Sequence, residues 1–116
     1  MPRPFSGYTG RSTMRLIAAM VQDADAPDLL NALIEHGFRA TRIETTGGFL
    51  RGSSSMILVG VASEKVEDVL DVMRTHCHTR KQLVTPTEAP FLNEAIEVEI
   101  GGAIVFVWDI GRFERL

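Results

Sequence analysis

The sequence predicts an α+β domain of the ferredoxin-like class, with the order β-α-β-β-α-β and an extra C-terminal β-hairpin. Three features lead to this prediction. Short apolar or alternating segments, typical of strands, recur along the chain. Two segments of helical periodicity separate them, and a Gly-Gly pair joins the last two β segments. The length of 116 residues suits one domain with one core.

The first strand and helix have the clearest signals. Residues 14–22, MRLIAAMVQ, are almost continuously apolar, which is typical of a central strand. Asp23 or Asp25 can cap the helix that follows, with Pro27 in its first turn and Gly37 just past its end. Apolar residues at helical spacing predict one buried stripe: Ala26, Leu29, Leu30, Leu33 and Ile34.

Two β segments and a second helix come next. Residues 38–46 alternate and are rich in β-branched side chains, and residues 55–62 read as a second central strand. Gly60 inside that strand indicates a bulge or a close backbone approach. Residues 63–77 predict a helix with Ser63 as its N-cap. Its apolar stripe is Val66, Val69, Leu70, Met73 and Cys77.

The C-terminal part predicts a loop and a hairpin. Residues 85–95 contain two prolines and have no periodicity, so they form a loop. Residues 96–100 alternate strictly, and Gly101-Gly102 predicts a two-residue turn into a return strand at 103–108.

A sheet of this class carries both helices on one face. The predicted strands are too apolar for the other face to be wet. We therefore expect other copies of the chain to cover it, which predicts a closed homo-oligomer with clefts between its subunits.

Composition excludes several classes of function. The net charge of −3 gives no general attraction to nucleic acid polymers or anionic membranes. No apolar run is long enough to span a bilayer. One cysteine, Cys77, permits no internal disulfide and fits the reducing cytoplasm. Residues 1–13 lack periodicity and are expected to be a disordered extension, so the folded domain is 14–116.

Neither catalysis nor a resident cofactor is expected. The chain has no G-x-S-x-G, C-x-x-C or Walker A spacing. His76, Cys77 and His78 are adjacent, so they point in different directions, and His36 is the one other histidine. A zinc site needs about four ligands that converge on one point.

The segment 40–60, ATRIETTGGFLRGSSSMILVG, holds the strongest candidate site. Gly47 and Gly48 leave backbone N–H groups accessible to an anion. Cations, a hydroxyl and large apolar side chains surround them: Arg39, Thr41, Arg42, Arg51, Phe49 and Leu50. These are the parts of a nucleotide pocket. Equally, the segment fits a plain β-loop whose Phe49 packs into its own core.

The segments VQD, FRAT, TTGGFLR, TRKQLV and EVEIGGAIVFV resemble the PII-like cyclic di-AMP receptor family, over about residues 14–113. That resemblance implies a cytoplasmic homotrimer of ferredoxin-like subunits that acts in signal transduction without catalysis. It implies that cyclic di-AMP binds in the clefts between subunits and that loop ordering relays its level to a protein target, which the sequence does not identify.

The resemblance also implies the ligand-binding residues: Arg39, Ala40, Thr41, Phe49, Leu50, Arg51, Ser54 and Gly60. Relatives have asparagine where Ser54 stands, and often asparagine for Gly37 and glutamine for Arg115. A serine hydroxyl cannot repeat a bidentate amide contact with adenine. The alternative is therefore the same trimer sensing ATP, ADP or another cyclic dinucleotide. The loop 85–95 is also shorter than in typical relatives.

Overall fold

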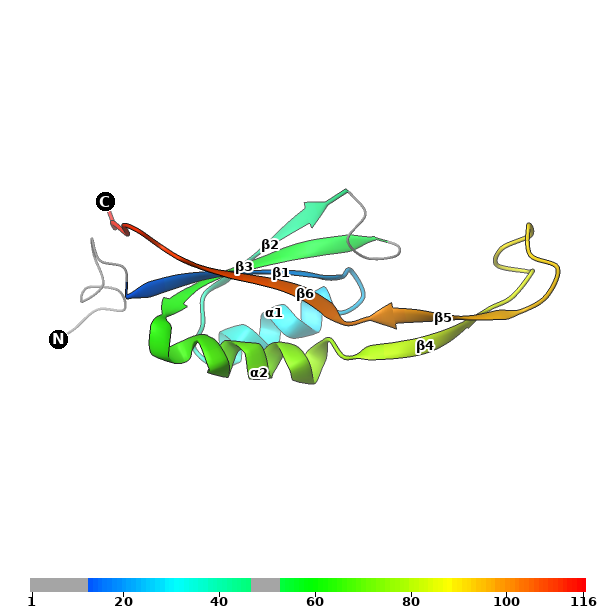
Figure 1. Cartoon of the computed structure of the whole chain (residues 1–116), viewed down its shortest axis with the longest axis horizontal. Helices are drawn as coiled ribbons and strands as arrows, with labels where there is room; N and C mark the ends of the chain where they lie inside the picture. The colour runs from blue at the N-terminus through cyan, green and yellow to red at the C-terminus, as the bar shows by residue number, and fades with distance from the viewer. Residues whose placement is uncertain (1–12, 47–52) are drawn as a thin grey trace.

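The computed structural model describes residues 13–46 and 53–116. Figure 1 shows the elements in chain order. They are β1 (Met14–Gln22), α1 (Ala26–Glu35), β2 (Ala40–Thr45), β3 (Ser54–Ala62), a 3-10 turn (Ser63–Lys65), α2 (Val66–His76), β4 (Thr79–Val84), β5 (Ile96–Gly101) and β6 (Ala103–Asp109). Neither helix of the described part is long and apolar enough to cross a bilayer.

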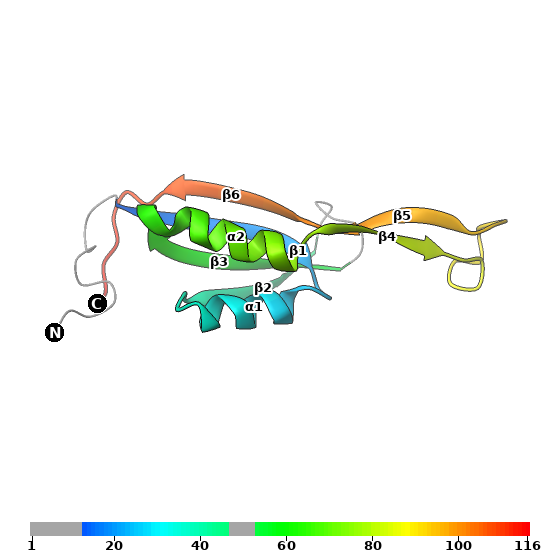
Figure 2. The same cartoon turned by 90° about the horizontal axis from the view of Figure 1, so that it is seen from below.

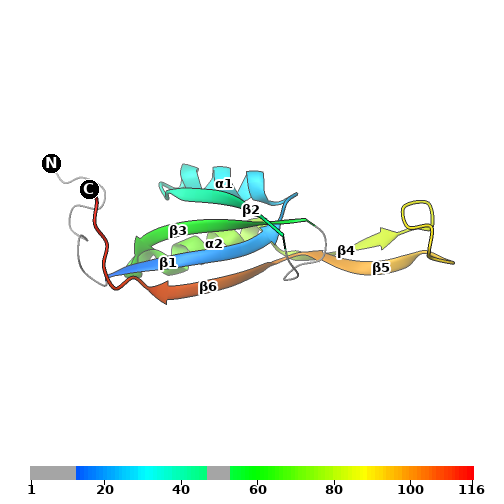
Figure 3. The ribbon, with the colours of Figure 1, turned by 90° about the horizontal axis from the view of Figure 1, so that it is seen from above.

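Four strands form one antiparallel sheet in the order β2-β3-β1-β6. Both helices lie on the same side of this sheet (Figure 2). Figure 3 looks onto the other side, where α2 lies behind the strands. The ferredoxin-like class predicted from the sequence is confirmed. We call the side without helices the open face.

The core lies between the sheet and the helices. Alternate residues of β1 and β3, among them Ile17 and Val59, meet Leu33 of α1 and Val69 of α2, and all four are at most 1 % exposed. This is the alternation expected for strands with one face on a core. Truncating a side chain such as Leu33 to alanine costs about 2–5 kcal/mol.

The helix ends differ from the predicted caps in two places. Asp25 is the N-cap of α1, but its side chain makes no capping hydrogen bond. Ser63 does not cap α2, because its hydroxyl donates to the carbonyl of Thr13 at 2.8 Å. The end of α1 agrees with the sequence, since Gly37 follows the helix with φ of 85°, a conformation that favours glycine.

The predicted hairpin at Gly101-Gly102 is wrong. β5 pairs with β4, and β6 pairs with β1, so the two strands that flank the glycines belong to different sheets. The fourth strand of the ferredoxin-like unit is β6. The additional strands are β4 and β5, which are inserted before it.

The predicted bulge at Gly60 is also absent. The β1–β3 register runs without interruption from Met14↔Ala62 to Gln22↔Ser54. No atom lies within 4 Å of a Cβ built on Gly60, so the chain itself makes no close approach there. The space beside Gly60 on the open face is available to another molecule.

Strands β4 and β5 form a two-stranded ribbon that projects from one end of the body (Figure 1). The ribbon accounts for the elongated shape, with extents of 62 × 24 × 19 Å. A two-stranded ribbon is marginally stable on its own. Its root, at Thr79 and Gly101, is therefore the part through which the body holds it.

Candidate nucleotide site

The strand registers assign the predicted site residues to the two faces of the sheet. Thr41 lies opposite Leu58, Ser54 opposite Thr45, and Gly60 opposite Leu16. These positions belong to the open face, because the residues that alternate with them enter the core. Ala40 lies on the helix side and packs against that core. It therefore offers a ligand its backbone rather than its side chain.

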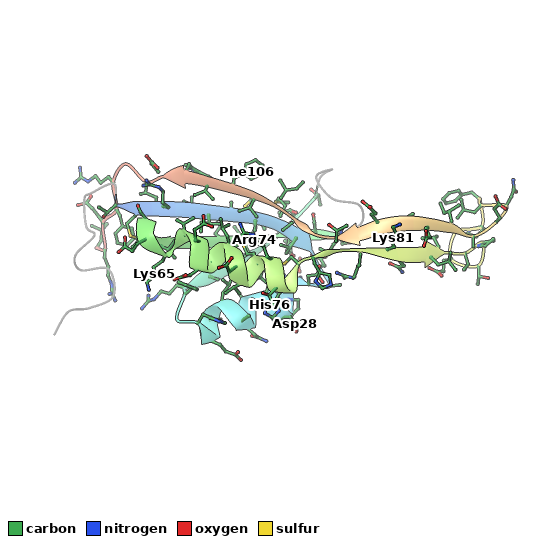
Figure 4. The ribbon with its side chains drawn as sticks, turned by 60° about the horizontal axis from the view of Figure 1, so that its bottom comes forward. Asp28, Lys65, Arg74, His76, Lys81 and Phe106 are labelled. Carbon is green, nitrogen blue, oxygen red and sulfur yellow. The ribbon has the colours of Figure 1, made fainter. Side chains whose placement is uncertain are left out.

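A groove lies at the start of β2. Arg39, directly before the strand, and Gly60 of β3 line it together with Phe38 and residues of α2 such as Lys65. Its volume is about 970 Å³. Lys65 and His76, at the two ends of α2, are labelled in Figure 4 and both line the groove. The structure thus brings Arg39 and the backbone of Gly60 together at a groove on the helix side of the sheet, where Asp68 and Asp71 of α2 balance the charges of Arg39 and Lys65.

Ser54 lies at the far end of β3 from this groove. Gly60 is six positions further along the extended strand, which corresponds to about 20 Å. Ser54 is 4 % exposed. Its Oγ lies 3.2 Å from Oγ1 of Thr45, and the Thr45 hydroxyl is 3.1 Å from the carbonyl of Ser54. Within one chain the predicted residues therefore form two separate groups.

The remaining predicted residues, Phe49, Leu50 and Arg51, lie outside the described residues. The same is true of Gly47 and Gly48. Both interpretations of this segment, as a nucleotide-covering loop and as a loop packed on its own core, therefore stay predictions.

Arg42 does not belong to the open face, although its charge suggested a contact with a ligand. Its Nε donates to the Ser55 hydroxyl at 3.0 Å, and its Nη2 lies 3.6 Å from Oδ1 of Asp23. The Ser55 hydroxyl, fully buried, donates to the same Asp23 oxygen at 2.5 Å. Arg42 therefore fixes the β2–β3 hairpin to the turn between β1 and α1. The sequence pattern marks Asp23 as a candidate cap and Ser55 as the first residue of a strand, and it indicates no contact between them.

A second ion pair holds the root of the ribbon. Nη2 of Arg80 on β4 lies 3.1 Å from Oδ1 of Asp25, whose side chain is 11 % exposed. The buried thiol of Cys77 is close by. Burial and, to a lesser degree, the Asp25 carboxylate raise the pKa of Cys77 to about 11, while Arg80 opposes this shift. Cys77 is therefore a protonated core thiol at neutral pH.

Among the residues that the structure describes, no three or more His, Cys, Asp or Glu side chains gather into a group that could hold a metal ion.

The open face is strongly apolar. Phe106 and Trp108 of β6 lie opposite Ala18 and Leu16 of β1 and are 44 % and 48 % exposed. Further apolar residues occupy the same face by register: Met20, Ile43, Met56, Leu58 and Ile104. Neighbouring exposed apolar side chains of this kind are typical of surfaces that bind another molecule.

Comparison with known proteins identifies the family. The chain matches the sequence model described as cyclic-di-AMP receptor over residues 14–116. It belongs to the cyclic-di-AMP receptor family. The match covers the whole described domain, from the start of β1 onward, and so includes both groups of predicted site residues. The family resemblance read from the sequence is confirmed.

Solved structures agree with this membership. A protein of unknown function from Pediococcus pentosaceus is 36 % identical, with a TM-score of 0.73 over 90 % of this chain and 99 % of the other. The PII protein of Arabidopsis thaliana, solved with citrate, is 18 % identical, with a TM-score of 0.59 over 85 % and 78 % of the two chains. A DUF3240 family protein from Shewanella baltica is 16 % identical, with a TM-score of 0.56 over 90 % and 98 %. The last two show that this member of the receptor family has a PII-like fold.

Proposed function

We propose that this receptor-family member binds cyclic di-AMP in clefts between the subunits of a homotrimer and signals its level to a protein partner. The observation that carries the proposal is the family match over residues 14–116. The position of Arg39 beside Gly60 at an open groove agrees with it, since an arginine fork suits a phosphate. The proposal includes no catalytic step and no resident cofactor.

The separation of the site into two groups supports clefts between subunits. Arg39, Thr41 and Gly60 lie near one end of β3, and Ser54 lies about 20 Å away along the same strand. A closed ring places one subunit's first group beside a neighbour's second group. The apolar open face supplies the surface on which such neighbours pack.

The relay works by a shift of populations. A ligand that contacts the β2–β3 hairpin favours the arrangement of the loops to which it binds best. Two elements are available to a partner, namely this hairpin and the β4–β5 ribbon. The exposed Phe91 in the connection between β4 and β5, at 85 % exposure, gives the ribbon an apolar point of contact. A cytoplasmic location fits a small domain with one cysteine and therefore no internal disulfide.

Isothermal titration of cyclic di-AMP, with cyclic di-GMP and ATP alongside, tests the proposal. We expect saturable binding of one cyclic di-AMP per chain. Arg39→Ala should weaken it about tenfold or more, since it removes a charged contact to phosphate. Arg74→Ala is the matched control, because it removes an exposed cation from α2 that is paired with Asp71. A folded protein that gives no heat with millimolar cyclic di-AMP contradicts the proposal.

A second candidate keeps the fold and changes the ligand. It is favoured by Ser54, whose hydroxyl lies at hydrogen-bonding distance from Thr45 rather than presenting an amide. The ligand is then ATP, ADP or another cyclic dinucleotide. A thermal-shift comparison of these nucleotides separates the candidates, because the ligand that binds the native state raises Tm most.

A further inference from the structure

Two acidic residues on one short turn contact both the β2–β3 hairpin and the β4–β5 ribbon. The turn between β1 and α1 contains Asp23 and Asp25, with one residue between them. Asp23 contacts the hairpin β2–β3, and Asp25 contacts the ribbon β4–β5. Two elements that are remote in sequence are thus connected through the three-residue backbone of this turn.

The link to the hairpin consists of three contacts. The Asp23 carboxylate accepts from Ser55 at 2.5 Å and lies 3.6 Å from Arg42. The backbone N–H of Asp23 donates to the carbonyl of Ser53 at 3.0 Å. Ser55 is fully buried. Because the side-chain contacts share one carboxylate oxygen, a displacement of β2 or β3 moves the turn.

The link to the ribbon is a nearly buried ion pair. Asp25 accepts from Nη2 of Arg80 at 3.1 Å and from Nη1 at 3.4 Å. The carboxylate is 11 % exposed, and it makes no capping bond to α1. Its side-chain interaction is therefore directed to the ribbon rather than to its own helix.

We propose that Asp23 and Asp25 are positioning residues that couple the nucleotide-binding β2–β3 hairpin to the β4–β5 ribbon, so that a nucleotide on the hairpin changes the stability of the ribbon root. The inference rests on the proposed function for the identity of the ligand. Coupling through two polar links in series requires both of them. Loss of either link uncouples the ribbon from the hairpin, while the hairpin can still bind the nucleotide.

Cys77 reports on the ribbon root without any labelling mutation. It is the one cysteine in the chain and is 3 % exposed. It lines a groove together with Thr79 and Gly102, the residues where the ribbon joins the body. A thiol reagent such as dithionitrobenzoate therefore reacts with Cys77 only when the root opens.

The experiment measures the rate of Cys77 modification with and without saturating cyclic di-AMP. In the unaltered chain we expect the nucleotide to change the rate about five- to tenfold. The ratio should fall close to one in three variants, Asp25→Asn, Arg80→Met and Asp23→Asn. Calorimetry should still show that each of them binds cyclic di-AMP. Asp28→Asn and Lys81→Met, which alter exposed charges next to the links, should keep the ratio.

The ratio separates coupling from direct electrostatics. Asp25 raises the pKa of the thiol and Arg80 lowers it, so the two variants change the intrinsic reactivity of Cys77 in opposite directions. Coupling predicts that both lose the nucleotide effect. If both keep the full ratio while they bind cyclic di-AMP, the inference is overturned.

If the unaltered chain binds no cyclic di-AMP, that result contradicts only the proposed function. The coupling can then be tested without a ligand. Asp23→Asn should then raise the Cys77 rate about fivefold, although Asp23 belongs to the hairpin link. Ser55→Ala tests the same link without a change of charge, and Ser53→Ala is its control because it keeps the carbonyl that Asp23 uses. Unchanged rates in both Asp23→Asn and Ser55→Ala overturn the coupling.

Discussion

Gly101 lies directly against Arg80 at the root of the ribbon. A Cβ on Gly101 would lie 2.6 Å from Nη1 of Arg80 and 2.7 Å from the carbonyl oxygen of His78. The backbone of Gly101 has φ of 80°, which costs a residue with a side chain about 1–2 kcal/mol. The positive φ and the fixed His78 carbonyl therefore require a glycine at this position, beside the guanidinium that binds Asp25.

Gly101→Ala should accordingly destabilise the fold by about 2 kcal/mol or more, because strain and the clash with the His78 carbonyl add together. Urea unfolding followed by circular dichroism measures the change. Gly111→Ala is the matched control, since no atom lies within 4 Å of its Cβ and its φ is not positive. Equal stability of the two variants would show that the root adapts without strain.

Cys77 should make the stability fall at alkaline pH. Burial raises the pKa of its thiol from 9.0 to about 11, so the unfolded chain loses this proton first as pH rises. The native state is then disfavoured progressively between pH 9 and 11, by about 2–3 kcal/mol in total. Below pH 9 the contribution of the thiol to the free energy of unfolding does not change with pH.

Cys77→Ala removes this part of the pH dependence, while all other alkaline titrations remain. The difference in unfolding free energy between the variant and the parent chain should therefore shrink above pH 9. Parallel curves from pH 7 to 11 would mean that the thiol ionises equally well in both states.

The apolar open face should hold the subunits together. Trp108 is 48 % exposed and lies opposite Leu16, so Trp108→Glu places a charge in the contact between copies. Sedimentation should show a shift from trimer to monomer, since an unpaired buried charge costs several kcal/mol. Leu83→Glu, at a ribbon position of 55 % exposure, serves as control. Trp108→Glu that stays trimeric would place the interface elsewhere.

Ser54→Asn tests how the chain recognises adenine. Under the family resemblance an amide at this position contacts the base with a donor and an acceptor. We expect the affinity for cyclic di-AMP to rise about ten- to a hundredfold, as one bidentate base contact is worth about 1–3 kcal/mol. Ser53→Asn, one position outside the strand and exposed, provides the comparison. Weaker binding by Ser54→Asn alone would show that the serine is adapted to this chain's own ligand.

The sequence predicted the elements whose side chains pack on the core. The bounds of β1 agree to the residue, because nine nearly continuous apolar positions define it. β4 received no prediction, since TRKQLV is mostly exposed in the ribbon and carries little hydrophobic pattern. The Gly-Gly pair led to the wrong prediction of a hairpin for a related reason. Positive φ at Gly101 and Gly102 suits a tight turn, but it equally suits a chain that crosses from one sheet to another.

The resemblance assigned ligand contacts to Arg39, Thr41 and Gly60, and these roles stay predictions. The strand registers add that Thr41 and Gly60 lie on the open face. The pair Asp25 and Arg80 is separated by 55 residues, so no local pattern indicates it. Tertiary structure alone decides that Asp25 contacts the ribbon instead of capping its own helix.

Because Thr79 and Gly101 are directly opposite each other, the ribbon leaves the body and returns to it at one place. Residues can therefore be removed from or added to its two strands in equal numbers without a change in the core. The ribbon is in this sense a module of adjustable length. Its length can change while the four-stranded sheet and its helices stay the same.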